Sequence, residues 1–479
     1  MLLGDPLKKN VVMDTTLSQK VNISWFYPHI CAFQDKIRDK SSFFKFMDND
    51  MEQQKENLLY IHIPFCHTFC GYCGCFKEKF GAFNYDSRKE FCHLLVKEMK
   101  MKVASPLLRD TKIHYIAFGG GTPSILENDL YQIIFEGIRR NFDLSELEGV
   151  CMEGNISSLV EAEKVEVLAE HGVTRFSFGV QSFDDKLRKN MSVSASKDEI
   201  DGLAKRIHAA GVPFAIDLIF NMPGQTREMF QHDLNEAYRI NSDYVHTYLF
   251  NQYPSTWLDD RIKSAKYDEL PTAEKEVDMW NILMDSHDRA GYGNQMIVNF
   301  FGKNPAPHKV GMELQLGMNK LHGSNVIGIG PGSFSYIEGY NYKNYRNVGQ
   351  YMQDVRNDVM PADIGNFTSE EELKHRVMAY FPIFTKIRKA DVPNIERFGL
   401  ILERLIDEGF VSETEELYSL TRTGKVWAGN IAQLFYSESQ SRYKLKSYYY
   451  SVKHAANPFN TDRMNVVGKG STPIEEVFS

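Results

Sequence analysis

The sequence lacks any run of 18 uninterrupted apolar residues, which argues against a helix that spans a bilayer. It also lacks an excess of basic residues: 63 acidic residues outnumber 55 basic ones, for a formal net charge of -8. Such a balance disfavours nucleic acid or an anionic membrane surface as the main partner. No secretion signal is recognisable, because basic residues and no small-residue cleavage site follow the first short apolar stretch. We therefore expect a cytoplasmic protein.

Cysteines are few among the 479 residues, and they are unevenly distributed. Three are scattered and are expected to be small buried apolar residues: Cys31, Cys92 and Cys151. The other four lie close together in the order C-x3-C-x2-C-x-C: Cys66, Cys70, Cys73 and Cys75. In a large chain without a secretion signal, such a cluster predicts a metal or redox centre rather than disulfides.

A structural zinc site is disfavoured, because such a site usually needs a second ligand pair across a longer loop and the sequence has none. Three thiolates on one short loop suit three irons of a [4Fe–4S] cluster, which leaves the fourth iron open. We expect these ligands to be Cys66, Cys70 and Cys73. Their spacing resembles that of the radical S-adenosylmethionine (SAM) superfamily, in which the amino and carboxylate groups of SAM chelate the fourth iron.

After the cysteine loop, short apolar runs alternate with helical patterns. The expected strands are 59–63, 113–118, 150–153, 175–179, 214–218 and 244–249. Ser196 and Glu199 form a capping box for one helix, which ends near Gly211. Such alternation is typical of parallel β/α units with their chemistry at the carboxyl ends of the strands. Six units predict an α/β fold with the partial (β/α)6 barrel of the radical SAM superfamily rather than a closed eight-unit barrel.

The pattern changes beyond about residue 300. A Gly-rich apolar segment at 326–335 predicts a strand and a turn, and residues 368–443 predict helices followed by a hairpin, as in a winged helix. The acidic charge favours a packing or lid role for this module over DNA binding. The expected division is an N-terminal extension (1–55), the barrel (56–300), a connecting segment (301–367), a mainly helical, winged-helix-like domain (368–443) and an extended tail (444–479).

Glycine-rich and polar motifs follow the expected strands. Gly119-Gly120-Gly121-Thr122-Pro123 comes directly after one strand, where glycines allow the backbone to approach a ligand closely. Glu153 can accept hydrogen bonds from ribose hydroxyls, although a solvated carboxylate is the alternative. Gln181 and Asp217 interrupt apolar runs at their strand ends, which indicates residues of a site rather than of the core.

These motifs, with Tyr60-x-His62-Ile63-Pro64-Phe65-Cys66, resemble the oxygen-independent coproporphyrinogen III dehydrogenase group over residues 56–350. The resemblance implies two bound SAM molecules. Residues expected at the cluster-bound SAM are Tyr60, Gly120 and Glu153. Residues expected at the second SAM are Tyr72, Gly121, Thr122, Gln181 and Asp217. Related sequences have an arginine where this chain has Val193, so Arg188 and Lys189 are candidates to take its role.

Three branches of this group imply different functions. Heme chaperones keep three cysteines and typically lack the fourth, so Cys75 argues against that branch and is expected to be catalytic. The second branch decarboxylates the propionates of coproporphyrinogen III. The third, the anaerobic heme-degrading methyltransferases (anaerobilin synthases), is favoured by Asp5-Pro6-Leu7 and by the segments 217–222 and 301–322. His308 or His322 is then a candidate ligand of heme iron, with a surface or hydrogen-bonded histidine as the alternative for each.

The favoured branch implies a C-methyltransferase that opens the ring of heme, forms a methylated linear tetrapyrrole and releases iron. The 5′-deoxyadenosyl radical would take hydrogen from the methyl group of a second SAM, or, in the dehydrogenase, from a propionate β-carbon. Both reactions imply an external low-potential electron donor such as a flavodoxin or flavin reductase. Neither implies a nucleic acid partner or a membrane span.

Overall fold

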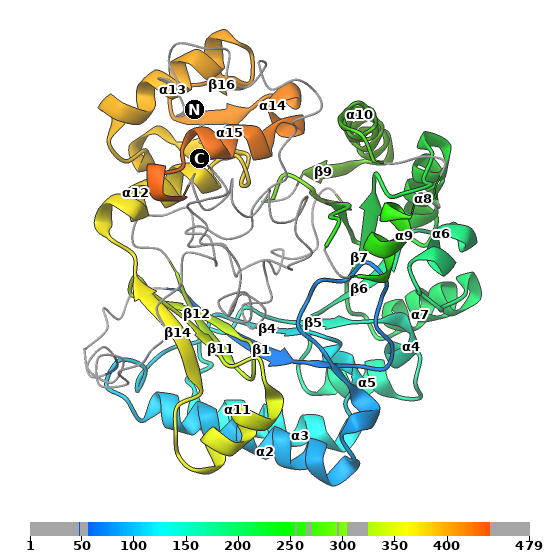
Figure 1. The fold of residues 1–479 in the computed structure, drawn as a ribbon, viewed down its shortest axis with the longest axis vertical. Coiled ribbons are helices and arrows are strands. Elements are labelled where there is room, and N and C mark those ends of the chain that lie inside the picture. The colour runs from blue at the N-terminus through cyan, green and yellow to red at the C-terminus, as the bar shows by residue number, and fades with distance from the viewer. Residues whose placement is uncertain are drawn as a thin grey trace.

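A mixed sheet of twelve strands runs through the computed structural model, in the order β14-β13-β12-β11-β1-β4-β5-β6-β7-β8-β10-β9 (Figure 1). The structure describes Met47 and residues 56–253, 256–264, 267, 271–294, 297–303 and 324–440. The expected extension and tail therefore lie outside the described residues, apart from Met47.

The centre of the sheet is parallel. Its strands are β1 (Asn57–Ile63), β4 (Tyr115–Gly120), β5 (Gly149–Gly154), β6 (Arg175–Gln181), β7 (Phe214–Phe220), β8 (Tyr244–Leu249) and β11 (Asn325–Ile329). The first six confirm the strands expected from the sequence. β11 lies where a strand and a turn were expected, and its pairing in parallel with the other edge of β1 was not expected. Its five residues are all buried, as is typical of a parallel strand covered on both faces.

Antiparallel strands extend both edges of this core. One edge carries β12 (Phe334–Ile337), β13 (Tyr340–Asn344) and β14 (Ala362–Phe367), and the other carries β10 (Phe300–Lys303) and β9 (Tyr292–Asn294). Residues 324–367, expected in a connecting segment, thus supply four strands and α11 (Val348–Arg356) to the same structure. The domain boundaries stay a prediction.

Helices cover one face of the sheet, which we call the outer face (Figure 1). They are α2 (Tyr85–Val103), α3 (Asn128–Asn141), α4 (Ile156–Leu159), α5 (Lys164–Glu170), α7 (Lys197–Ala209), α8 (Arg227–Arg239), α10 (Ala273–Ala290) and α11. Two further helices, α6 (Asp185–Asn190) and α9 (Trp257–Lys263), share a smaller apolar cluster. The capping box at Ser196 and Glu199 is confirmed at the start of α7, and Gly211 follows its end with φ +70°.

Strand alternation divides the side chains between the outer and the inner face. On β1, Leu59 and Ile61 belong to the core beneath the helices, so Leu58 and Tyr60 face the opposite way. On the central strand β5, Met152 is buried in the outer core whereas Glu153 is exposed. Because β5 has a neighbouring strand on each side, an exposed Glu153 means that the inner face borders open space.

The C-terminal module consists of α12 (Glu370–Tyr380), β15 (Lys386–Arg388), α13 (Ile395–Asp407), β16 (Val411–Glu413), β17 (Leu417–Leu420), α14 (Arg422–Val426) and α15 (Ala428–Leu434). The expected helix and hairpin are present as α13 and β16–β17, and β15 completes a three-stranded sheet. The Arg376 guanidinium on α12 lies 3.8 Å from the Tyr336 ring centroid on β12. Arg422 forms ion pairs with Asp285 and Asp288 on α10. The module therefore contacts β12 through α12 and the outer helix α10 through α14.

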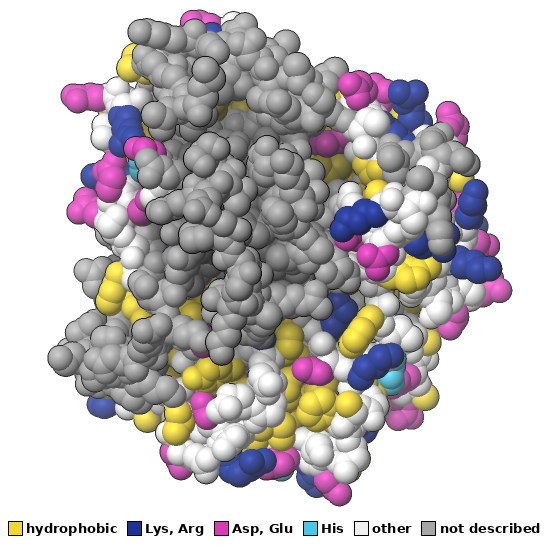
Figure 2. Space-filling view, viewed as in Figure 1, with side chains coloured by type: hydrophobic (Ala, Val, Ile, Leu, Met, Phe, Trp, Pro, Cys, Tyr) yellow, Lys and Arg dark blue, Asp and Glu magenta, His cyan; other side chains and the backbone are white. Residues whose placement is uncertain are grey.

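Charged side chains of both signs are interspersed over the described part of the face seen in Figure 2. This mixture is in keeping with the acidic composition. No helix among the described residues is long and apolar enough to cross a membrane.

Candidate active site

The cysteine loop begins where β1 ends. It runs between two short paired strands, β2 (Phe65–Cys66) and β3 (Glu78–Lys79). Two backbone hydrogen bonds anchor its middle, from the Gly71 amide to the Met191 carbonyl at 2.8 Å and from the Leu258 amide to the Gly71 carbonyl at 3.0 Å. The loop is thereby fixed against the segments that follow α6 and begin α9.

The thiols of this loop have different environments. Cys66 is buried, with its Sγ 3.5 Å from the Thr122 hydroxyl. Burial raises the pKa of Cys70 to about 11. A hydrogen bond from the Cys75 thiol and the nearby Lys77 ammonium lower the pKa of Cys73 to about 6. Lys77 also donates to the Cys73 carbonyl at 2.8 Å, so one cation stabilises a thiolate on this loop.

The donor set fits a [4Fe–4S] cluster better than a single metal ion. Within the described ranges, no three His, Cys, Asp or Glu side chains converge on one ion. A cluster does not require such convergence, because each cysteine ligates a different iron. Cys66, Cys70 and Cys73 are free thiols on one short loop, as these separate ligands must be.

The glycines at the end of β4 leave room for two site residues. A Cβ on Gly119 would lie 2.9 Å from the Tyr60 ring and 3.0 Å from Glu153 Oε2. Gly120 has φ +120°, and its amide donates to the Glu153 carboxylate. A Cβ on Gly121 would lie only 2.7 Å from the backbone that leads into the cysteine loop. Only glycine permits this close approach of the two strand ends.

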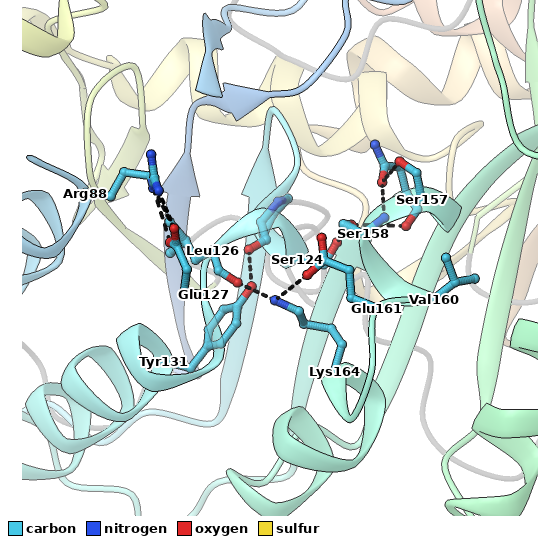
Figure 3. A network of polar contacts seen from close by, with 12 residues as sticks. Arg88, Ser124, Leu126, Glu127, Tyr131, Ser157, Ser158, Val160, Glu161 and Lys164 are labelled. Atoms are coloured by element: carbon cyan, nitrogen blue, oxygen red, sulfur yellow. Dashed lines mark hydrogen bonds and ion pairs between the residues drawn. The ribbon is translucent and has the colours of Figure 1, made fainter. Parts of the chain in front are cut away.

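A polar network holds the turn after these glycines from behind (Figure 3). The Tyr131 hydroxyl donates to the Pro123 carbonyl at 2.8 Å, and the buried Lys164 ammonium donates to the Leu126 carbonyl. Ser124 and Ser158 share a hydrogen bond of 2.5 Å. Burial lowers the pKa of Lys164. Tyr131, Ser158 and Lys164 come from helices of the outer face. These helices therefore hold the turn that follows the glycines in place.

Polar side chains of adjacent strands meet on the inner face. The register places Glu153 beside Ser177 and Asp217 beside His246. Ser177 Oγ donates to Asp217 Oδ1 at 3.3 Å, and His246 Nδ1 lies 3.0 Å from the same oxygen. Desolvation by the barrel walls and the charge of Asp217 raise the pKa of Glu153 to about 7, against the opposing charge of Arg175. Glu153 is exposed, but only to the space that these walls surround.

Three residues expected to bind SAM lie at the cysteine loop itself. The Tyr60 hydroxyl lies 2.9 Å from His62 Nδ1, and the Tyr72 hydroxyl is hydrogen-bonded to the Cys70 thiol. Thr122 contacts Cys66, as described above. Cys75 is exposed and close enough to Tyr60 and Glu153 for its charge to act on both. The structure therefore brings Cys75 together with the residues expected at the cluster-bound SAM.

Gln181 ends β6 at an irregularity of the sheet. Its φ is +67°, and the register between β6 and β7 shifts between Gly179 and Gln181. Its side chain folds back over Gly179, where a Cβ would lie 2.2 Å from Gln181 Nε2. Such backbone strain in a non-glycine residue is typical of functional sites.

The candidates to replace the missing arginine are placed differently. Arg188 is buried and donates to three backbone carbonyls of the surrounding turn, so it stabilises this turn. Its role towards a ligand stays a prediction. Lys189 is exposed. Val193 is half-buried and packs with Tyr72 in a small apolar cluster. His308 and His322 lie outside the described residues.

Ser177, Arg175 and His246 share the inner face with the expected site residues, although sequence reasoning did not select them. A signal was available, because period-two alternation along 175–181 and 244–249 puts them on one face. The apolar residues between them obscured that alternation.

The comparisons with known proteins agree with this geometry. The family model described as "Radical SAM superfamily" matches residues 60–237, which include the cysteine loop, the glycine motif and Asp217. This stretch of the chain therefore matches the radical SAM superfamily. A [4Fe–4S] cluster and SAM are the cofactors that this superfamily implies.

Relatives of three kinds are similar to this chain. Anaerobilin synthase of Escherichia coli O157:H7 is 28% identical over 81% of this chain and 85% of its own length. Heme chaperone HemW of Bacillus subtilis is 29% identical over 79% and 99%. Oxygen-independent coproporphyrinogen III oxidase of Salmonella typhimurium is 25% identical over 89% and 96%. The chain is therefore similar to proteins of all three branches of the group that its motifs resemble.

The fold class is confirmed as well. The solved coproporphyrinogen III oxidase HemN of Escherichia coli matches with a TM-score of 0.71 at 19% identity, over 87% of this chain and 99% of that chain. The chain therefore shares its fold.

Proposed function

We propose that the chain is a radical SAM C-methyltransferase that acts on heme anaerobically, opens the porphyrin to a methylated linear tetrapyrrole (anaerobilin) and releases iron. The observation that carries this proposal is Cys75, which is exposed on the cysteine loop and near enough to Tyr60 and Glu153 for charges on these groups to act on one another. A thiol held there supports catalysis rather than storage of heme. The similarity to anaerobilin synthase supports heme as the substrate.

The bound cluster and SAM supply a 5′-deoxyadenosyl radical. We assign Tyr60, Gly120 and Glu153 to the cluster-bound SAM, since they converge at the ends of β1, β4 and β5. Tyr72, Gly121, Thr122, Gln181 and Asp217 are assigned to a second SAM. The strand walls exclude water and competing hydrogen donors, which a reactive radical requires. Cys75 is assigned a catalytic role, with its hydrogen held at Sγ in the same space.

Two alternatives remain in the same group. An oxygen-independent coproporphyrinogen III dehydrogenase is supported by the relative that covers 89% of this chain. A heme chaperone is supported by HemW, although its function does not require a catalytic thiol. The proposed electron donor is a flavodoxin or flavin reductase, and the cytoplasmic location stays a prediction.

Anaerobic incubation with dithionite, SAM and either heme or coproporphyrinogen III tests the proposal, with products identified by mass spectrometry. We expect an iron-free, methylated linear tetrapyrrole from heme, and no product without SAM. Loss of carboxylates from coproporphyrinogen III would establish the dehydrogenase instead. Heme that stays bound and intact would establish the chaperone.

A further inference from the structure

His246 and Asp217 form a carboxylate–histidine pair on the inner face. They are register partners on β7 and β8, and His246 Nδ1 lies 3.0 Å from Asp217 Oδ1. The imidazole is 2% exposed and stacks on Phe300, with ring centroids 3.9 Å apart and 17° between the planes. The carboxylate and the stacked ring together fix the orientation of the imidazole.

The other ring nitrogen of His246, Nε2, is buried and makes no hydrogen bond within the described structure. Because the ionised Asp217 carboxylate only accepts, Nδ1 carries the hydrogen and Nε2 carries a lone pair. Burial lowers the pKa of His246 despite the nearby carboxylate, and Arg175 adds to this effect. The imidazole is therefore neutral at physiological pH.

A second histidine provides an internal comparison. His287 on α10 stacks on Phe301, the residue next to Phe300 on β10, with ring centroids 4.0 Å apart and 10° between the planes. Its Nε2 is also buried without a partner in the described structure, but its Nδ1 meets the Tyr238 hydroxyl at 3.2 Å rather than a carboxylate. Phe301 belongs to the outer core, so His287 is accounted for by packing.

We propose that His246 ligates the iron of the heme substrate through Nε2, with Asp217 as its positioning partner; this inference rests on the proposed function. A neutral imidazole whose Nδ1–H donates to a carboxylate is the usual arrangement of a metal-ligating histidine. A porphyrin supplies four nitrogens, so one protein ligand suffices and no converging set of side chains is needed. Phe300, which stacks on the imidazole, also meets the Tyr248 ring edge to face at 5.7 Å, so aromatic rings surround this histidine.

Ferric heme titrated into the full-length protein, without SAM or reductant, tests this assignment by Soret absorption and electron paramagnetic resonance. We expect a histidine-ligated spectrum in the wild type. His246→Ala should lose that spectrum, weaken heme binding and recover the spectrum with added imidazole. Asp217→Asn should keep the ligand and weaken heme binding by about 10–100-fold. In a separate redox titration of the heme-loaded protein it should raise the reduction potential of the bound iron, because the imidazole becomes less electron-rich. His287→Gln, the matched control, should keep the wild-type spectrum.

Failure of the inference differs from failure of the proposed function. A wild type that forms the linear tetrapyrrole while His246→Ala keeps an unaltered heme spectrum overturns the inference alone. A wild type that neither binds nor converts heme overturns both. If His246→Ala does not fold, His246→Met replaces it, with a switch to thioether ligation as the expected signature and an unchanged spectrum as the contrary result.

Discussion

The two faces of the same sheet place their carboxyl groups in different surroundings. On the outer face, the fully buried Glu98 accepts hydrogen bonds from the Gly330 amide, the Asn344 amide group and the Tyr351 hydroxyl at 2.7–2.8 Å. It also pairs with the fully buried Lys102 at 2.8 Å. This network joins α2 to β11, β13 and α11, so its polar groups serve the fold.

The inner face has the opposite character. Glu153 has its pKa raised to about 7, and His246 Nε2 has no partner within the described ranges. Buried polar atoms without partners cost free energy unless a ligand completes them. The difference teaches that a buried carboxylate with a cation and three hydrogen-bond donors supports the fold, whereas a carboxyl with a raised pKa marks the candidate site.

The largest expected effect concerns the cysteine loop at the end of β1. Cys66→Ser, Cys70→Ser and Cys73→Ser should each abolish the visible absorbance of the reconstituted cluster and reductive cleavage of SAM, because each removes an iron ligand. Cys75→Ser should keep both and stop turnover. The control is Cys92→Ser on α2, which is buried on the outer face and should keep the cluster. A Cys70→Ser protein with an intact cluster and SAM cleavage would contradict the assignment.

The second-largest expected effect is a loss of stability when the buried ion pair of the outer face is broken. Lys102→Met leaves Glu98 charged and without its cation, so it should lower the free energy of unfolding by about 3–5 kcal/mol in urea denaturation. Adding Glu98→Gln removes the uncompensated charge and keeps an acceptor oxygen, so it should recover more than half of that loss. Equal stability of Lys102→Met and the wild type would show that the network is not needed by the fold.

The smallest effect concerns pH and the inner face. A carboxyl whose pKa is raised from 4.5 to about 7 stabilises the fold fully below pH 4.5 and loses that contribution as pH rises through 7. Glu153→Gln stays neutral, so relative to the wild type it should gain stability between pH 5 and pH 8. Because the side chain is exposed to the interior, we expect a gain of about 1 kcal/mol or less.

Glu166→Gln on α5 is the control for this pH dependence. The Arg206 hydrogen bond lowers the pKa of Glu166, so its contribution is present at neutral pH and lost as pH falls. Glu166→Gln should therefore lose stability relative to the wild type as pH rises, opposite to Glu153→Gln. Parallel pH profiles for the two variants would remove the distinction between the faces.

The sequence predicted those parts of the fold that leave a local signal. The six parallel strands and the helix capped by Ser196 have such signals in period-two or helical patterns and in capping residues. The parallel pairing of β11 with β1 leaves none, because it joins residues 268 positions apart: Asn325 Nδ2 donates to Asn57 Oδ1 at 3.0 Å.

In the candidate site too, residues with a local sequence signal were predicted, whereas contacts between distant segments were not. Gly119 to Gly121 and Glu153 stood out because they end apolar runs. The pairing of Asp217 with His246 depends on the register between β7 and β8, which no single strand encodes. Likewise, the positions of Tyr72 and Thr122 beside cysteine sulfurs depend on how the loop folds back on itself. The roles of these residues stay predictions.

The distant partner of β1 has a consequence for the timing of synthesis. β1, which leads into the cysteine loop, is flanked by β4 and β11, and β11 ends at Ile329. At about 5–20 residues per second, a ribosome needs roughly 15–50 s to extend the chain from β1 to β11. Throughout that interval one edge of β1 has no native partner, and the nascent chain presents its cysteine motif before the sheet is complete. Any insertion of the iron–sulfur cluster during this interval would therefore meet a cysteine loop whose leading strand is held on one edge only.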